Sequence, residues 1–514
     1  MKQISILTKR PWYKRIPDGT TPHAALRMDV RSHNGHNSIV YTQQRMLDEY
    51  YPTSHDIYNK ALYPDIPHEV EELVERRHDD GSVTEELVKH QYFEDYPRVA
   101  FAYQQEIETK RTDHLTGNDV TFNRNWDEQD EQKDKLFQEL VDAWEQAGME
   151  DAIFESAHNA NIVADCALVF HLYSDEYGKK QLGWNVHSFF KGDDIYAHRD
   201  QRSGRVHLYA RRFTDDYGNE MVEVLDDTNY YLFRARSEED EGEGEKYEFE
   251  GGRFYLDGYV MEGSPAAHGF KFCPVAYKRN EDGPVWVFSQ DVIEAYEEDF
   301  NGLRHNNKTY GEPILATKGD DVEGVPESNG TVKYMSMGKD DSASYLQAQS
   351  AADSYMKALD KLEELIYILS FIVKTPELKS GDLPAAALKI LYSPAVEKAM
   401  HEVKDWQRFI DAAFAIFRYG IGVVRGKTLD YNATNLPIKV FLTPYIHQSN
   451  SAMVADIVQA VNTGVLSKRT GAERLSGYIA EENEYDRIVS EIKKEQEADL
   501  IYQETLQKAT ATGT

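Results

Sequence analysis

The spacing of apolar residues changes character along the chain. The first forty-odd residues are polar and predict an irregular arm, and a helical pattern begins at about Ser82. Over 130–147 the apolar residues Leu136, Leu140, Val141 and Trp144 recur on one helical face, and a second helix is expected over 152–164. The N-terminal part should therefore contain packed helices.

From about Ala167 the pattern becomes that of a β-meander. Short aromatic and β-branched runs alternate with turns such as Asp216-Tyr-Gly218. The expected strands are 168–173, 206–210, 221–225, 230–233 and 254–256. The acidic stretch Glu238–Glu245 between two of them is expected to be a solvated hairpin loop.

After Pro284 the helical period returns. A first helix is expected at 288–308, with Ser289 as N-cap and an apolar stripe of Val292, Tyr296, Phe300 and Leu303. A second is expected at 343–373, with a packing seam of Leu359, Leu362, Ile366, Leu369 and Val373. The insert between the two helices, 309–342, is rich in glycine and contains strand-like runs at 313–316 and 331–335.

A third helix should follow a short polar loop at 374–384. Pro384 suits its first turn, and Pro394 inside the pattern predicts a kink. One more strand is expected at 435–442, and the last residues, from Asn450 on, have a helical pattern. The fold class that results is α+β.

The charge narrows the possible functions. The chain has 57 basic and 89 acidic residues among 514, a net charge of −32. Proteins that hold nucleic acid tightly carry a basic surface, so tight DNA or RNA binding is disfavoured, while a passage that repels the duplex is compatible with this charge. Cys166 and Cys273 form no disulfide or zinc pattern, and no apolar run is long enough for a signal core or a membrane span.

The motifs that could indicate an enzyme are weak. The string Gly420–Thr428 lacks the first glycine of a phosphate-binding loop and follows a helix, so a glycine helix stop is expected instead. The histidines His33, His36 and His55 lack zinc-ligand spacing, and Asp193–Asp200 is expected to be a hydrogen-bonded turn. No catalytic residue, metal site or cofactor is expected.

Three segments, in this order, resemble the portal proteins of tailed bacteriophages, of the siphophage type. They are Lys308-Thr-Tyr-Gly-Glu-Pro-Ile-Leu-Ala-Thr-Lys-Gly319, Ser380-Gly-Asp-Leu-Pro-Ala-Ala-Ala-Leu-Lys-Ile-Leu-Tyr392, and Val461-Asn-Thr-Gly-Val-Leu-Ser-Lys-Arg-Thr470 followed by Glu484-Tyr-Asp-Arg-Ile-Val-Ser-Glu491. The resemblance extends over about 288–500. Residues before 288 resemble the family only in their general character, a helical and β-rich wing.

The resemblance implies a domain order. It consists of an N-terminal arm and wing (1–287), a first stem helix (288–308), a small α/β clip (309–342), a second stem helix (343–373), a tunnel loop (374–384), a long kinked helix with a wing strand (385–449) and an α-helical crown (450–514). The stem helices would pack through Val292, Tyr296, Phe300, Leu359, Leu362, Ile366 and Leu369. The loop region would touch DNA through Lys374, Lys379, Ser380 and Lys389.

The resemblance also implies a function and partners. It implies a non-enzymatic ring of twelve copies at one capsid vertex of the virion, assembled in the host cytoplasm, through which double-stranded DNA enters and leaves. The implied partners are the terminase large subunit, the head–tail adaptor, the major capsid protein and the scaffolding protein, with no membrane. Two alternatives are a virion scaffold protein without a DNA channel, and a hydrolase or nucleotide-binding protein that uses Gly420–Thr428 or Asp193–Asp200.

Overall fold

A computed structural model of the chain describes most of its residues. These are 30–33, 37–40, 42–77, 83–126, 130–200, 202–237, 246–249, 254–310, 314–318, 342–346, 352–374, 385–445 and 450–464, together with 471 and 493. The chain divides into two compact units. The first comprises residues 1–374 and 395–445, and the second comprises 375–394 and 446–514.

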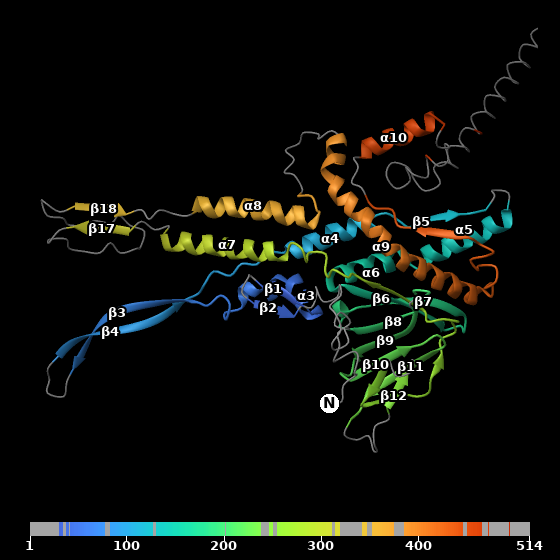
Figure 1. Cartoon of the computed structure of the whole chain (residues 1–514), viewed down its shortest axis with the longest axis horizontal. Helices are drawn as coiled ribbons and strands as arrows, with labels where there is room; N and C mark the ends of the chain where they lie inside the picture. The colour runs from blue at the N-terminus through green and yellow to red at the C-terminus, as the bar shows by residue number, and fades with distance from the viewer. Residues whose placement is uncertain are drawn as a thin grey trace, which may run out of the picture. The chain divides into compact units, whose positions relative to one another are not determined.

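Helices and strands alternate in blocks (Figure 1). The helices are α3 (Gln43–Tyr50), η2 (Pro52–Ser54), η3 (Asp56–Tyr58), α4 (Tyr103–Thr116), α5 (Glu131–Gln146), α6 (Met149–Val163), η4 (Phe189–Lys191), α7 (Gln290–Tyr310), α8 (Ala352–Ser370), α9 (Ala385–Arg425) and α10 (Asn450–Asn462). The strands up to residue 214 are β1 (Val30–His33), β2 (Asn37–Val40), β3 (Ile66–Arg77), β4 (Val83–Glu94), β5 (Thr121–Arg124), β6 (Asp165–Ser174), β7 (Lys180–His187), β8 (Asp194–Arg199) and β9 (Val206–Thr214). The later strands are β10 (Glu220–Leu225), β11 (Asn229–Ala235), β12 (Lys246–Phe249), β13 (Phe254–Asp257), β14 (Tyr259–Met261), β15 (Ala266–Ala267), β16 (Val275–Arg279), β17 (Ile314–Lys318), β18 (Ser342–Leu346) and β19 (Ile438–Phe441).

The strands of the predicted meander form two neighbouring sheets. In the larger one the order is β14-β11-β10-β9-β8, and β15 also pairs with β11. The smaller sheet has the order β16-β6-β7, so the end of the meander returns beside its first strand. All of these pairs are antiparallel, as short connections allow.

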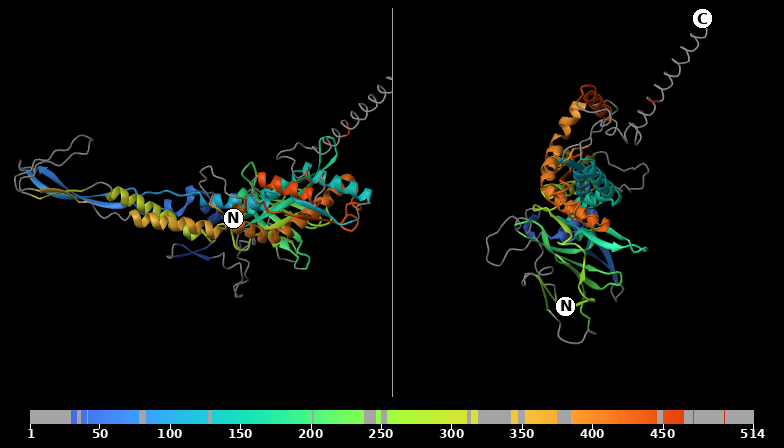
Figure 2. Two further views of the ribbon diagram at one scale, coloured as in Figure 1. Left: turned by 90° about the horizontal axis from the view of Figure 1, so that it is seen from above. Right: turned by 90° about the vertical axis from the view of Figure 1, so that its right-hand side faces the viewer.

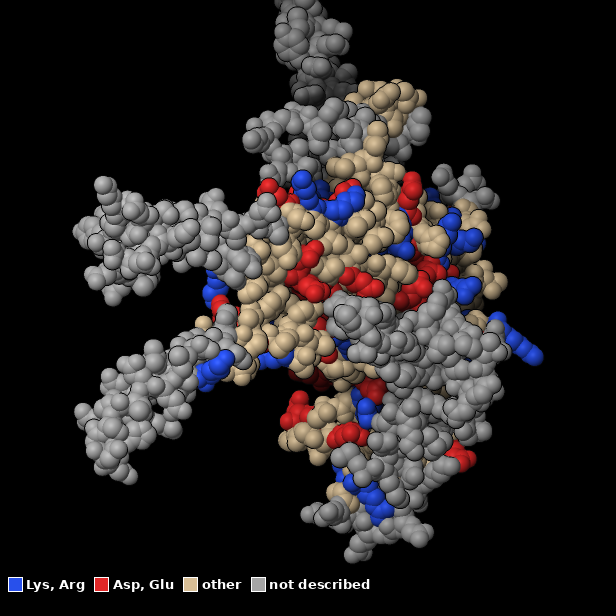
Figure 3. All heavy atoms as spheres, turned by 60° about the vertical axis from the view of Figure 1, so that its left-hand side comes forward, with Lys and Arg blue, Asp and Glu red and all other residues tan. Residues whose placement is uncertain are grey.

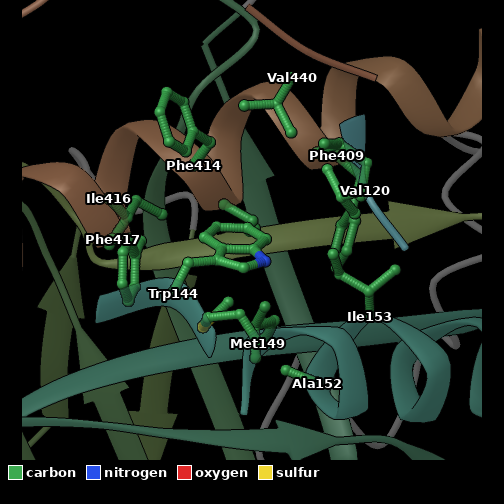
Figure 4. Close-up of a cluster of buried hydrophobic side chains, with 14 of the residues drawn as sticks. Val120, Trp144, Met149, Ala152, Ile153, Phe409, Phe414, Ile416, Phe417 and Val440 are labelled. Carbon is green, nitrogen blue, oxygen red and sulfur yellow. The ribbon is translucent and has the colours of Figure 1, made fainter. Parts of the chain in front are cut away.

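The main core lies between the smaller sheet, α5, α6 and α9. Trp144 is fully buried at its centre, and the rings of Phe414 and Phe417 pack edge-on against it, the Phe417 centroid at 5.1 Å (Figure 4). The indole Nε1 donates to Glu150 Oε1 at 2.9 Å, which satisfies the polar edge of the ring. The predicted face of α5 is confirmed in Leu140 and Trp144, which are buried, while Leu136 is partly buried.

The helices of the second half also follow their apolar pattern. α7 and α8 lie side by side (Figure 1 and the left view of Figure 2). α9 contains Pro394 in its interior, and the boundary between the compact units falls directly after this residue. The kink predicted there stays a prediction.

Four expectations about local structure were wrong, and one strand was not predicted. Residues 83–94, expected to be helical, form β4, because they pair along their whole length with β3. Residues 343–346, expected to open the second long helix, belong to β18, because they pair with β17. In both cases pairing between strands overrides the local helical pattern.

The other two wrong expectations were a turn and an irregular segment. The Asp193–Asp200 stretch contains β8, an edge strand of the larger sheet, and the inner residues of this strand are buried. Residues 30–33 and 37–40 form a two-stranded hairpin within the expected irregular arm. The strand β7 was not expected at all, because its sequence mixes polar and apolar residues.

Candidate functional site

Three of the predicted packing residues of the two long helices, Val292, Tyr296 and Ile366, lie in or against one apolar cluster. Leu359 and Ile366 of α8 are buried, and Val292 and Tyr296 of α7 are partly buried against Ile293 and Trp286. Leu362 is half-buried, whereas Leu369 is 37% exposed and lies beside the exposed Ile368. In a single copy the seam is thus buried at its centre and open near the end of α8.

An aromatic segment that precedes α4 fills the space beside α7. The ring of Phe101 packs edge-on against Tyr296 and Phe300, with centroids at 5.1 and 5.0 Å. Tyr103 packs edge-on against Tyr296 and Tyr367 in the same way. This segment was not expected to contact the long helices, and the apolar Phe101-Ala-Tyr103 triplet was the signal that could have suggested it.

A buried polar network ties α7 to the N-terminal helices. His55 places Nδ1 2.7 Å from Glu297 Oε1 and Nε2 2.8 Å from the Glu49 carbonyl oxygen. Both contacts suit N–H donors, so the geometry fits an imidazolium. Burial lowers the pKa of the His55 imidazole, but the Glu297 carboxylate and the Glu49 groups outweigh it and raise that pKa above its ordinary value.

The acidic partners of this network are held by other donors. Glu49 accepts from Trp286 Nε1 at 3.1 Å and from Arg45 Nε at 3.3 Å, and Glu297 accepts from the Phe101 N–H at 2.8 Å. Asn301 bonds the backbone of Val99 in both directions, at 2.9 Å each. Polar contacts from Glu297 and Asn301 therefore anchor α7 in addition to its apolar packing.

The C-terminus of α8 is closed by a Schellman motif. The Ile372 N–H donates to the Tyr367 carbonyl at 3.2 Å, and the Phe371 N–H donates to the Ile368 carbonyl at 3.3 Å. The left-handed position of this motif is held by Phe371, with φ of 57°, although glycine is the usual residue there.

Two cations of α4 bind the open carbonyls beside this motif. Arg111 Nη1 donates to the Ser370 carbonyl at 3.2 Å, and Lys110 Nζ donates to the Val373 carbonyl at 2.8 Å. Positive charge at a helix C-terminus is favourable, because the carbonyl end of the helix is negative. The chain is thus fixed on α4 immediately before the predicted loop.

The predicted DNA-contacting residues fall partly inside the described chain. Lys374 is 60% exposed and pairs with Glu363 Oε1 at 2.7 Å. Lys389 lies in α9, and its side chain is outside the described residues, as are Lys379 and Ser380. The acidic stretch 238–245, the strand expected at 331–335 and most of the expected crown also lie outside them.

The string Gly420–Thr428 is a helix stop. Gly426 has φ of 66°, its N–H donates to the Val423 carbonyl, and the Lys427 N–H donates to the Gly422 carbonyl at 2.8 Å. Lys427 Nζ pairs with Glu139 Oε2 at 2.9 Å, so the lysine is engaged within the fold. The N–H groups of Gly426 and Lys427 are thus bonded to helix carbonyls, as the prediction of a glycine helix stop requires.

The described part of the chain contains neither a metal cluster nor a disulfide. Within it, no cluster of His, Cys, Asp and Glu could hold a metal ion, and both cysteines are buried and free. Among the same residues, no helix has the length and apolar character needed to cross a bilayer.

The chain matches one family over most of its length. The model of that family, described as phage portal protein, SPP1 Gp6-like, matches residues 34–498. The portal protein of Bacillus phage SPP1 is 22% identical over 419 residues, which cover 77% of this chain and 76% of that protein. A chain in the solved neck of an empty GTA particle, computed with C6 symmetry, is similar with a TM-score of 0.37 and 10% identity, over 73% of this chain and 89% of that chain.

Proposed function

The chain belongs to the phage portal protein family, SPP1 Gp6-like, and we propose that about a dozen copies form the ring through which double-stranded DNA enters and leaves the capsid. As a member of this family it is a structural connector at a capsid vertex of the virion. The observation that carries the proposal is the match over residues 34–498, which includes both long helices and the segment between α8 and α9.

The charge of the protein supports a passage rather than a DNA-binding surface. Asp and Glu side chains gather in the middle of one face, with Lys and Arg mostly around them (Figure 3). With a net charge of −32 per copy, a ring repels the duplex at long range. Translocation then meets little friction, because few phosphates are held by cations.

The long helices fit the role of the stem. α7 and α8 take this position in the proposal, the β17–β18 pair belongs to the clip, and 374–384 is the tunnel loop. Two strands alone are marginally stable in water, so the clip should gain order from neighbouring copies. The exposed Leu369 and Ile368 at the end of α8 would be covered in the ring.

The partners follow from the position of each segment in the ring. The clip would face the terminase large subunit during packaging and the head–tail adaptor afterwards. The β-rich wing would face the major capsid protein, with assembly in the host cytoplasm on a scaffolding protein. A virion scaffold without a channel remains the second candidate, and it predicts an assembly without a central hole.

Electron microscopy tests the ring directly. Negative-stain class averages of the purified protein should show rings of about a dozen copies around a hole wide enough for a duplex. Closed dimers or tetramers without a hole would refute the conduit. A protein that stays monomeric alone and also with scaffolding protein would refute the ring.

The loop lysines provide a functional test. We expect the double variant Lys374→Ala/Lys379→Ala to lower the amount of DNA packaged or retained in a reconstituted particle, while ring assembly stays normal. Lys361→Ala is the matched control, because Lys361 is equally exposed on α8 and pairs with Glu364 at 2.8 Å. Unchanged packaging and retention in the double variant would remove the DNA-contacting role from this loop.

A further inference from the structure

A groove in the first compact unit combines a cationic rim with an apolar floor. It has a volume of about 630 Å³ and lies between the β8–β9 turn, the segment before β16, and α9. Arg199, Arg205, Lys271 and Arg408 stand at its rim, and its floor contains Phe272, Val275, Tyr277, Ala412 and Ile416. Such a volume accommodates an aromatic side chain and its neighbours. This set of residues is called the basic groove below.

The cations of the basic groove are not neutralised within the fold. Arg199 donates to the Tyr277 carbonyl and lies over the Tyr277 ring, and Arg205 lies over the ring of Phe272, 5.4 Å from its centroid. Within the described part of the chain, none of the four rim cations pairs with a carboxylate. In a chain with a net charge of −32, four such cations around one concave site are an unusual concentration.

The two acids in the groove wall are engaged elsewhere. Asp200 accepts from the Ser203 N–H at 2.8 Å. Asp227 accepts from the Cys273 N–H at 3.1 Å and contacts His207 Nδ1 at 2.8 Å. Neither carboxylate forms an ion pair with the rim cations, all of which belong to the described residues. The groove therefore favours an occupant that brings carboxylates and an apolar or aromatic side chain.

The chain itself exposes a segment of this chemistry. The β9–β10 turn, Asp215-Asp-Tyr-Gly218, carries Tyr217, which is 91% exposed. Asp215 Oδ1 accepts from the Tyr217 and Asn219 N–H groups at 2.9 and 2.8 Å, which holds the turn rigid. Asp216 is exposed beside the tyrosine and has no ion pair among the described residues. This turn is called the acidic tyrosine tip below.

The tip and the groove lie at opposite ends of one strand. Val206 at the start of β9 lines the groove, and the tip follows Thr214 at its end. β9 has 9 residues, so at about 3.3 Å each the two features are roughly 30 Å apart. A tip therefore cannot reach the groove of its own copy. It can reach that of a neighbour, and such a head-to-tail contact between different surfaces is the kind that closes rings.

We propose that the acidic tyrosine tip of one copy docks in the basic groove of the next, with Tyr217 on the apolar floor and Asp216 against the rim cations. This contact rests on the proposed ring and adds a specific intersubunit contact, called the joint below. Tyrosine and arginine are the side chains that most often dominate protein interfaces, since both bury a large area and retain a polar group. The rigid tip also loses little conformational freedom on docking.

A second turn in the chain serves as a matched control. The β6–β7 turn, Asp175-Glu-Tyr-Gly178, repeats the chemistry of the tip, and its Tyr177 is 93% exposed. β6 pairs antiparallel with β16 so that Val169 lies opposite Val275. Continuing this register brings the segment before β16 beside the end of β6, so the Tyr177 turn lies at the groove's own side of the sheet. It can therefore contact the groove of its own copy, whereas the acidic tyrosine tip cannot.

Photo-crosslinking in purified rings tests the joint. With Tyr217→p-benzoylphenylalanine, irradiation should link neighbouring copies, and mass spectrometry should find the links in 271–277 or 408–416. The same replacement at Tyr177 can link to 271–277 within its own copy, but it should give no links to these segments of another copy. Links from position 217 only to other segments, or groove links between copies from position 177, would overturn this contact while leaving the ring intact.

A charge exchange gives an independent measurement. Asp216→Lys and Arg408→Glu should each weaken association of copies roughly tenfold in analytical ultracentrifugation at physiological salt, and the double variant should regain most of the loss. Glu176→Lys should have no effect. Additive losses in the double variant would overturn the pairing. Wild-type protein that forms no ring under any condition would instead refute the proposed function, and this joint with it.

Discussion

The buried contact between His55 and Glu297 should make the attachment of α7 depend on pH. The perturbation is Glu297→Gln, which keeps the shape of the side chain and its acceptor for the Phe101 N–H but removes the charge. The folded-state pKa of His55 is raised above the ordinary value. The stabilisation is therefore fully present below about pH 6.5 and is lost as the pH rises through the folded-state pKa.

The size of the effect follows from burial. Both side chains are only 4% exposed, and removing one partner of a buried ion pair costs about 3–5 kcal/mol. In Glu297→Gln the imidazole can lose its proton and still donate to the Glu49 carbonyl, so we expect the low end of that range, about 3 kcal/mol, at pH 5.5. Above the folded-state pKa the difference should shrink below about 1 kcal/mol, because wild type then holds a neutral ring against a carboxylate.

Hydrogen exchange measured by mass spectrometry is the suitable assay, since a chain of several units does not unfold in one step. Peptides from 43–58 and 290–301 should exchange about 100-fold faster in Glu297→Gln than in wild type at pH 5.5, and nearly equally at pH 9. Comparing variants at one pH removes the intrinsic pH dependence of exchange. Glu298→Gln, the exposed next residue, is the control. A difference in exchange rate between variant and wild type that is constant or grows with pH would refute the assignment of His55 as an imidazolium.

Three further predictions concern backbone and burial. Phe371→Gly should be about 1 kcal/mol more stable than Phe371→Ala in exchange at the end of α8, because both lose the ring but only glycine adopts φ of 57° without strain; equal stabilities would contradict the strain. Burial raises the pKa of Asp165 to about 7, so wild type loses stability as the pH rises and this buried carboxyl becomes charged. The stability advantage of Asp165→Asn over wild type at β6 should therefore grow by about 2–4 kcal/mol between pH 5 and pH 8. An advantage that grows toward acid pH instead would contradict this reasoning. Gly422→Ala should lower the stability of the fold by about 1–3 kcal/mol, because the added Cβ would lie 2.9 Å from the Thr428 Cα. Gly420→Ala should be near neutral, because its Cβ meets only the movable end of the Leu182 side chain. Thermal unfolding of the two variants, compared with wild type, tests this difference.

The sequence predicted what depends on local spacing. The helical faces of α5 and α8 were readable from Leu140, Trp144, Leu359 and Ile366, which are buried as expected. The pairing of β17 with β18 was not readable, because the partner strands are separated by a long insert and 343–346 has a helical composition. The polar anchor of α7 was equally hidden, since His55 and Glu297 are 242 residues apart and a lone histidine carries no signal of its partner.

The return of α9 and β19 into the first compact unit has a consequence for the order of folding. The core around Trp144 is closed by residues from α9, and β19 pairs with β5 so that Thr121 and Thr443, 322 residues apart, come within 3.3 Å. During synthesis this core stays open until the segment around Thr443 has left the ribosome, because loop closure over such a distance needs both ends. A growing chain that has not reached this segment therefore offers no finished core surface for assembly into a ring.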